Sequence, residues 1–174
     1  PVQPMLAQTA ENVSEALATL GEAAIEHKLD GARIQVHKSM DEVRVYSRQS
    51  NDVTQACPEI VERMRAVSTK SVVLDGEAIA FDPEGRPHPF QTTMRRFGRK
   101  LDVAALRTSL PLTPVYFDCL FLEDADLTAR PAKERFGILL DTLGPEQVVP
   151  RLVTSDLGAA QRFVQDALDA GHEG

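Results

Sequence analysis

One short segment of the sequence combines a lysine with the charged neighbours that nucleophilic chemistry needs. From Glu26 to Arg33 it reads Glu-His-Lys-Leu-Asp-Gly-Ala-Arg, and we expect Lys28 at the end of a strand and Asp30-Gly31 in a tight turn. A lysine attacks only when it is deprotonated, and burial or nearby positive charge lowers the pKa of a lysine. The segment therefore predicts a nucleophilic lysine in a cleft, and a plain hairpin with surface charges would give the same pattern.

Three later segments carry side chains that could complete a site around this lysine. Arg48 directly follows a predicted strand and could reach the same cleft. Glu77 lies within an apolar strand, where a carboxylate is costly unless it is paired or binds a cation or a hydroxyl group. Phe117 and Asp118 are neighbours on another apolar strand, so only one of them can line the cleft. Taken alone, Glu77 could equally form a strand-edge ion pair, and Phe117 could be a core residue.

The composition is that of a globular protein with an acidic surface. The chain has 174 residues, 43% of them hydrophobic, and a net charge of -7, which argues against a freestanding nucleic-acid-binding module. Cys57 and Cys119 show no disulfide or metal-binding pattern, and the 4 histidines are interpreted as incidental, so we expect a reduced, cytoplasmic setting. No apolar run reaches the length of a membrane span, and we expect a monomer without membrane contact.

The hydrophobic periodicity predicts an α+β fold in which largely antiparallel sheets are flanked by helices. A β-meander is expected over residues 23–26, 32–38 and 43–47, with further strands at 71–81, 113–122 and 148–153. Helices are expected at 11–20, 58–64, 90–97, 102–107, 131–143 and 156–170. The length fits one domain or two small subdomains, and the meander would place Lys28 and Arg48 at one edge of a sheet.

In this order the segments resemble the motifs of the covalent nucleotidyltransferase superfamily, above all those of the ATP-dependent DNA ligases. Lys28, Asp30, Gly31 and Arg33 match the superfamily motif K-x-D-G-x-R, and Glu26 matches the acid that ligases carry two residues earlier. The later motifs resemble the following segments: Ser47-Arg48, Asp75-Gly76-Glu77, Tyr116-Phe117-Asp118 and His172-Glu173-Gly174, with Pro4-Met5-Leu6-Ala7 ahead of them. The resemblance implies residues 1–174 as a DNA ligase adenylation domain with an ATP-grasp-like, α+β nucleotidyltransferase fold.

The resemblance also implies a role for each matching residue. Lys28 would attack the α-phosphate of ATP to form lysyl-AMP, and the AMP would then pass to the 5′-phosphate of a DNA nick, which is sealed. The remaining residues would bind the nucleotide and Mg²⁺: Glu26 the adenine amino group, Arg33 and Arg48 the ribose and α-phosphate, Glu77 the ribose or Mg²⁺, Phe117 the adenine ring by stacking, and Glu173 Mg²⁺. The implied partner is nicked duplex DNA in the full-length protein.

Several features of the resemblance leave alternatives open. The family's final motif, with two lysines, and the oligonucleotide-binding domain would follow Gly174, so we expect a domain truncated before that motif, one that binds ATP but forms lysyl-AMP slowly or not at all. RNA ligases and GTP-using capping enzymes share the lysine motif, and a non-catalytic nucleotide-binding module would keep the fold. The basic run from Arg95 to Lys100 could contact a DNA backbone or could be a solvated loop.

Overall fold

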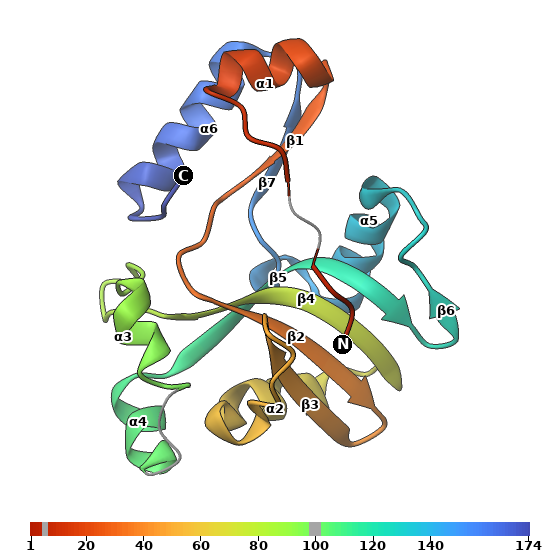
Figure 1. Ribbon diagram of the computed structural model, residues 1–174, viewed down its shortest axis with the longest axis vertical. Coiled ribbons are helices and arrows are strands. Elements are labelled where there is room, and N and C mark those ends of the chain that lie inside the picture. Colours follow the sequence, from red (N-terminus) through yellow and green to blue (C-terminus); the bar gives the residue numbers. More distant parts are fainter. Residues whose placement is uncertain (5–6, 98–101) are drawn as a thin grey trace. The chain divides into compact units, whose positions relative to one another are not determined.

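The computed structural model describes residues 1–4, 7–97 and 102–174 of the chain. The described residues form two compact units (Figure 1). The larger unit comprises residues 30–148 together with Pro1, and the smaller unit comprises residues 2–29 and 149–174. The chain therefore passes from the smaller unit into the larger one between Leu29 and Asp30, and it returns after Val148.

A five-stranded antiparallel sheet forms the centre of the larger unit, in the order β3-β2-β4-β5-β6 (Figure 1). β2 (Ala32–Ser39) pairs with β3 (Glu42–Ser47) and on its other side with β4 (Ser71–Ala80). β5 (Leu112–Leu122) pairs with β4 through two register irregularities, and the short β6 (Ala125–Asp126) follows at the edge. The predicted α+β class with antiparallel sheets is confirmed.

One face of this sheet is apolar and is covered by α2 (Pro58–Ala66) and α5 (Ala132–Leu143). The core cluster on this face includes the following residues from strands and helices: Ile34, Val36, Leu74, Ala78, Tyr116, Ile60, Met64, Leu139 and Leu143. Successive side chains of a strand point to opposite faces. The neighbours of these core residues therefore point away from the core, and Arg33, Asp75, Glu77 and Phe117 are among those neighbours.

A buried ion pair joins the helices beside the sheet. Arg96 follows α3 (Phe90–Met94), and its side chain is 0% exposed. Its guanidinium donates to both carboxylate oxygens of Glu59 in α2, at 2.7 and 3.1 Å. It also donates to the carbonyl of Leu110, just beyond α4 (Val103–Ser109), and to that of Ala56, the last residue of η1 (Thr54–Ala56).

The basic run from Arg95 to Lys100, which could have contacted DNA, is thus partly buried. Arg96 is buried, so neither prediction for the run, a DNA contact or a solvated loop, holds for this residue. Arg95 is exposed, while residues 98–100 of the run lie outside the described residues. A run of basic residues predicts a charged surface patch, because arginine side chains are rarely buried unless a carboxylate pairs with them. Here the buried carboxylate of Glu59 pairs with the arginine of the run.

The smaller unit contains a two-stranded antiparallel sheet and two helices. β1 (Ala23–Glu26) pairs with β7 (Arg151–Thr154) in the register Glu26 to Arg151. Two helices belong to the same unit and contact each other, α1 (Val13–Leu20) and α6 (Leu157–Asp169). Asn12 and Asp156 cap the two helices through their side chains, as the sequence predicts for Asp156.

The predicted β-meander is wrong in its first strand. β1 does not pair with β2, because its partner β7 lies more than a hundred residues later in the sequence. Residues 27–30 form neither a strand nor a turn, and Gly31 is not among the glycines with positive φ. The expected tight turn at Asp30-Gly31 is therefore replaced by a connection between the two units. In the described part of the chain, none of the helices has the length and apolarity needed to cross a bilayer.

Candidate nucleotide site

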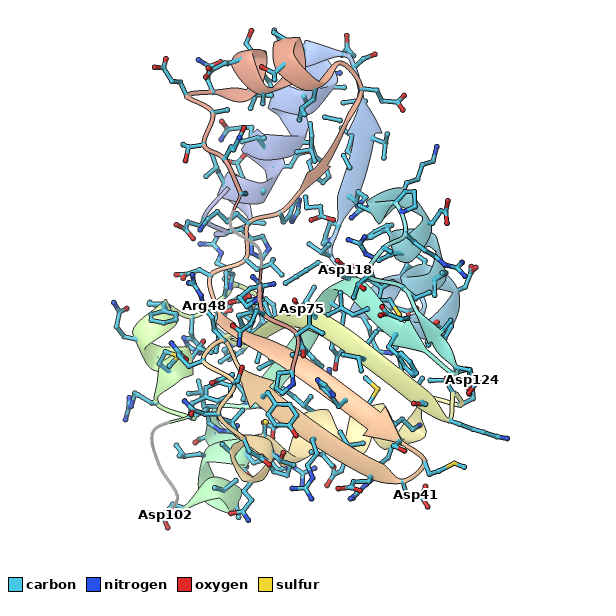
Figure 2. The ribbon with its side chains drawn as sticks, turned by 45° about the vertical axis from the view of Figure 1, so that its right-hand side comes forward. Asp41, Arg48, Asp75, Asp102, Asp118 and Asp124 are labelled. Atoms are coloured by element: carbon cyan, nitrogen blue, oxygen red, sulfur yellow. The ribbon has the colours of Figure 1, made fainter. Side chains whose placement is uncertain are left out.

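A pocket of about 240 Å³ in the larger unit brings together three of the predicted site residues. Arg33 comes from β2, Glu77 from the opposite position on β4, and Arg48 from the end of the β3 hairpin strand. Figure 2 labels Arg48 together with Asp75, which lies on the same strand as Glu77. The apolar part of the lining comes from α3 and the residues after it: Phe90, Met94 and Phe97. Two cations, one carboxyl group and an apolar wall suit a molecule with phosphates and a flat ring.

Arg33 is held in place by its neighbours on the sheet. Its Nε and Nη2 donate to the two carboxylate oxygens of Asp75 at 3.2 and 2.7 Å. The hydrogen bonds to Asp75 raise the pKa of Arg33, so the guanidinium keeps its positive charge. The same guanidinium lies over the Phe117 ring, with its carbon 5.4 Å from the ring centroid.

Phe117 and Asp118 lie on opposite sides of β5, as strand parity requires. Tyr116, the residue before Phe117, is fully buried in the core. Phe117 contacts Arg33 on the other face of the sheet. Asp118 instead accepts two hydrogen bonds from Arg135 of α5, at 2.8 and 2.9 Å. Phe117 is therefore the member of this pair whose ring contacts Arg33, although neither Phe117 nor Asp118 lines the pocket itself.

The carboxyl group of Glu77 is strongly perturbed. Burial raises its pKa to about 7, and the positive charge of Arg33 opposes part of that rise. At neutral pH the Glu77 carboxyl group is thus protonated in some molecules, where it can donate a hydrogen bond, and ionised in the others, where it only accepts. Either form can hydrogen-bond a hydroxyl group, such as that of a ribose.

Gly31 and Gly76 let two backbones approach closely beside the pocket. A Cβ at Gly31 would lie 2.6 Å from the carbonyl oxygen of Ala78 and 2.8 Å from Cγ of Glu77. A Cβ at Gly76 would lie 2.7 Å from the carbonyl oxygen of Val115. The glycine of the lysine segment is thus required by close packing against β4, and not by a turn.

Three other predicted residues belong to the smaller unit. The backbone N–H of Lys28 donates to the carbonyl of Gly174 at 2.6 Å, and that of Glu173 donates to the carbonyl of Lys28 at 3.1 Å. Their side chains also form an ion pair between the Lys28 ammonium and Glu173, and both are more than half exposed. Glu26 pairs with Arg151, a residue that the sequence analysis did not select. The predicted residues are therefore divided between the two units, four in the larger and three in the smaller.

His27 and His172 have a packing role in the smaller unit. Their ring centroids are 5.2 Å apart, and the His27 ring also lies 4.8 Å from the Phe163 ring of α6. Burial lowers the pKa of both histidines, which favours neutral rings in this cluster. Among the described residues there is no group of three or more histidine, cysteine, aspartate or glutamate side chains that could hold a metal ion. A metal ion here would need further oxygen ligands, such as phosphate and water.

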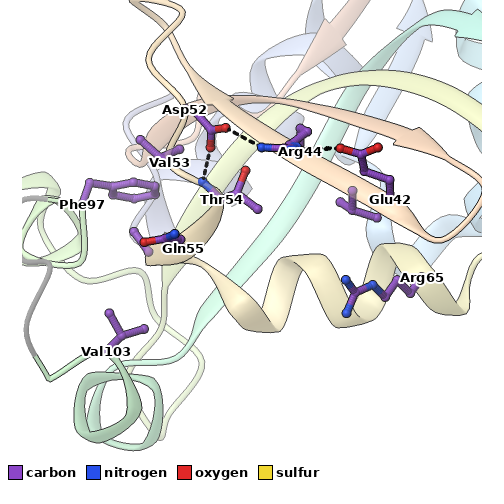
Figure 3. A pocket seen from close by; sticks show the side chains of 11 residues that line it. Glu42, Arg44, Asp52, Val53, Thr54, Gln55, Arg65, Phe97 and Val103 are labelled. Atoms are coloured by element: carbon purple, nitrogen blue, oxygen red, sulfur yellow. Dashed lines mark hydrogen bonds and ion pairs between the residues drawn. The ribbon is translucent and has the colours of Figure 1, made fainter.

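A second pocket, of about 660 Å³, lies beside β3, η1 and α2 (Figure 3). Three of its charged side chains are already paired, since Arg44 contacts both Glu42 and Asp52, and Arg65 donates to the backbone carbonyl of Asp41. None of the predicted site residues lines it. The smaller pocket with Arg33, Arg48 and Glu77 is therefore the better candidate for a nucleotide site.

Solved structures that share the fold of this chain include ATP-bound ligases. The ligase domain of Mycobacterium tuberculosis LigD is 28% identical with a TM-score of 0.66, over 88% of this chain and 47% of that chain. A mycobacterial DNA ligase D complexed with ATP and MES has the same identity and coverage, with a TM-score of 0.64. The bacteriophage T7 ligase complexed with ATP, at 17% identity and a TM-score of 0.54, shares the fold over 97% of this chain and 60% of that chain. The fold class is that of ATP-dependent ligases.

The sequence comparison specifies the family. The family model described as "ATP dependent DNA ligase domain" matches residues 4–174, and the chain belongs to this family. A "Probable DNA ligase" of Anaeromyxobacter sp. (strain Fw109-5) is 60% identical over all of this chain and 34% of its own length. Another, of Sorangium cellulosum (strain So ce56), is 55% identical over all of this chain and 33% of its own length. The chain thus spans about a third of these relatives, and the resemblance drawn from the motifs is confirmed.

Proposed function

We propose that this chain is the part of an ATP-dependent DNA ligase that forms the covalent nucleotide intermediate. The Lys28 amine attacks the α-phosphorus of ATP, a phosphorus–nitrogen bond forms, and the bond to the leaving pyrophosphate breaks. The attacking nitrogen loses its protons to a base or to water before and during the transfer. In the whole protein the AMP then passes to the 5′-phosphate of nicked duplex DNA, and a 3′-hydroxyl displaces it to seal the nick.

The observation that carries the proposal is the pocket shared by Arg33, Arg48 and Glu77. These residues come from three separate motifs, yet one pocket of the larger unit contains all of them. Arg33 and Arg48 supply positive charge for the ribose and α-phosphate, and phosphoryl transfer depends mainly on such positioning and charge neutralisation. Glu77 accepts or donates to a ribose hydroxyl, and Phe117 provides a flat surface for the adenine ring.

We further propose Mg²⁺ as the metal ion of the reaction, with Glu77 and Glu173 as its carboxylate ligands. Mg²⁺ binds one or two carboxylates and completes its shell with water and substrate phosphates. When bound, the ion would neutralise charge on the phosphates, while Arg33 and Arg48 position them.

The DNA partner belongs to the proposal for the whole protein. A net charge of -7 makes this chain a poor DNA-binding surface by itself, so we expect other parts of a longer protein to supply most of the contact with nicked DNA. A monomeric state in the cytoplasm completes the proposal. The family match favours this function over an RNA ligase, a capping enzyme or a non-catalytic nucleotide-binding module.

The test is retention of label after incubation with Mg²⁺ and ATP labelled in its α-phosphate. We expect label to accumulate on this chain slowly if at all, to accumulate faster on a protein of the relatives' full length, and to be abolished in both by Lys28→Ala. Lys133→Ala, at an exposed position of α5, serves as the matched control and should retain the label. Labelled GTP should give far less product. A protein of the relatives' full length that binds ATP and retains no label in long time courses would instead be a nucleotide-binding module.

A further inference from the structure

Residues 51–54, which we call the return segment, run back along the open edge of β3. β3 is the first strand in the order of the five-stranded sheet, so only one of its edges pairs with another strand of that sheet. On the other edge, the N–H of Val53 donates to the carbonyl of Val45 at 2.8 Å. The N–H of Val45 in turn donates to the hydroxyl oxygen of Thr54 at 2.9 Å. The return segment therefore takes the place of a neighbouring strand at this part of β3.

Thr54 holds the return segment through its side chain as well as its backbone (Figure 3). Its own N–H donates to Oδ1 of Asp52 at 2.9 Å. Hydrogen bonds from Thr54 lower the pKa of Asp52, so this carboxylate stays ionised and pairs with Arg44. Val45 is fully buried, and a buried N–H that lacks an acceptor costs free energy. The Thr54 hydroxyl thus completes the attachment of the return segment to β3.

A closed turn joins the end of β3 to the return segment. The N–H of Ser47 donates to the carbonyl of Asn51 at 2.9 Å, and the N–H of Asn51 donates to the hydroxyl of Ser47 at 3.3 Å. Within the turn, the N–H of Ser50 donates to the carbonyl of Ser47 at 2.8 Å, and Ser50 has a φ of 62°. A serine adopts this conformation at a cost, so the structure on both sides must hold the turn. The return segment supplies one of those sides.

The turn carries Arg48 into the lining of the pocket that also contains Arg33 and Glu77. Arg48 is exposed, and in the described part of the chain it forms no ion pair, whereas Arg33 is paired with Asp75. The Arg48 guanidinium can therefore pair with an anion from outside, such as a phosphate. Thr54 lines the larger pocket and not this one, so it can affect a nucleotide here only through other residues.

We infer that Thr54 is a positioning residue: by fixing the return segment, it holds the turn that presents Arg48 to the phosphates of the nucleotide. The inference rests on the proposed function, because it assigns how one cation of that site is held. All the residues involved belong to the larger unit. A turn that is fixed in advance does not have to be ordered when the ligand binds, and this saving strengthens binding. The return segment also protects an edge strand from pairing with other chains, a role that does not depend on Arg48.

The test is a double-mutant cycle on ATP affinity, measured by calorimetric titration. Thr54→Val removes the hydroxyl and should raise the dissociation constant for ATP about tenfold, since ordering the backbone of about one residue on binding costs that much. In an Arg48→Met background the same substitution should change the constant by less than about twofold, because the group that Thr54 positions is absent. Thr54→Ser keeps the hydroxyl and should restore most of the affinity.

Two further variants serve as a control and as a second route to the same result. Thr108→Val makes the same change at an exposed position of α4, where the hydroxyl donates to the carbonyl of Ala104, and should leave the ATP affinity unchanged. Asp52→Ala removes the acceptor of the Thr54 N–H at a more exposed position, and it takes the place of Thr54→Val in the cycle if that variant does not fold. Far-ultraviolet circular dichroism and the thermal midpoint check that each variant is folded.

The outcomes distinguish this inference from the proposed function. An unchanged ATP affinity in a folded Thr54→Val would leave the nucleotide site standing and overturn the inference. An equal loss of affinity with and without Arg48 would make Thr54 a structural residue, and would also overturn it. An Arg48→Met variant that binds ATP as tightly as the unmodified chain would do the same. If the unmodified chain binds no ATP at any accessible concentration, the proposed function fails, and the inference fails with it.

Discussion

Glu77 shows how a single buried carboxyl group couples the pocket to pH. Its neighbours on the same sheet face are Asp75, which is committed to Arg33, and Arg33 itself. Burial dominates the balance, so the folded protein holds the Glu77 proton up to a pKa of about 7, against 4.5 for the unperturbed group. A group of this kind is a candidate for function, because a folded protein rarely tolerates such a shift without a partner or a ligand.

The first prediction concerns the stability of Glu77→Gln as a function of pH. A raised carboxyl pKa means that the folded state binds the proton more tightly, so the wild type loses stability as pH rises from about 4.5 to about 7 and stays level above that range. The glutamine variant lacks this loss. Its stability relative to wild type should increase by on the order of 3 kcal/mol across the window, measured by urea unfolding at several pH values. A difference that does not vary with pH would contradict the assignment.

The second prediction concerns two glycine-to-alanine substitutions with opposite signs. Gly31→Ala places a Cβ against the backbone of β4 and should destabilise the protein by about 1–3 kcal/mol. Gly137, within α5, has no atom within 4 Å of its added Cβ, so Gly137→Ala should stabilise the protein by about 0.5–1 kcal/mol through helix propensity. Denaturant titration of both variants provides the measurement. A neutral Gly31→Ala would show that the close contact with β4 relaxes without cost.

At the scale of elements, a buried ion pair links the helices that form the pocket wall. Arg96 connects Glu59 of α2 with carbonyls at the end of η1 and beyond α4, and Phe97 follows it in the pocket lining. Glu59 in turn accepts from the backbone N–H of Leu112 at the start of β5. The pair therefore ties the segment after α3 to α2 and to the start of β5.

The third prediction follows from the burial of this ion pair between Arg96 and Glu59. Arg96→Met leaves Glu59 buried without its cation, and it should cost about 3–5 kcal/mol of unfolding free energy. Arg96→Met combined with Glu59→Leu removes the stranded charge, so it should recover a substantial part of the loss. Chemical denaturation of the single and double variants gives both values. If the double variant loses as much unfolding free energy as the two single substitutions do together, the unpaired buried charge is not the cause of the loss in Arg96→Met.

The sequence predicts most elements correctly because their signals are local. The alternation in β2 and β3, the proline at the start of α2 and the cap at Asp156 each lie within a few residues. The pairing of β1 with β7 is not local, and the sequence of a four-residue strand does not indicate which strand it pairs with. The burial of Arg96 is equally hidden, since only the fold brings Glu59 beside it.

The candidate site was predictable to a similar extent. Motif spacing selects Arg33, Arg48 and Glu77, and the fold groups them in one pocket. Arg151 was not predictable, because its significance comes from the cross-strand register with Glu26 and not from any local pattern. Gly31 was selected for an incorrect reason, since its conformation is ordinary and its contacts are close.

At the scale of the whole molecule, charge limits what this chain can do with DNA. Its formal charge of -7 opposes a polyanion, and one arginine of the basic run is buried. The fourth prediction is that the chain alone binds nicked duplex weakly, and that the binding declines steeply as salt increases. A gel-shift titration at several salt concentrations measures this. Tight binding at physiological salt would mean that a local basic surface outweighs the net charge.

The chain spans about a third of the length of its curated relatives. Covalent attachment of AMP is therefore the step of the proposed reaction that can be tested on this chain alone. The roles of Arg33, Arg48 and Glu77 all depend on where the nucleotide is attached. Attachment at Lys28 is thus the central claim.

The most direct measurement is the site of covalent AMP, mapped by tandem mass spectrometry after long incubation with ATP and Mg²⁺. It is made on this chain and on a protein of the relatives' full length that contains it. The account predicts AMP on the peptide that carries Lys28, with fragment ions that place it on the lysine nitrogen. AMP on another residue, or a full-length protein that seals nicks with Lys28 replaced by alanine, would contradict the account.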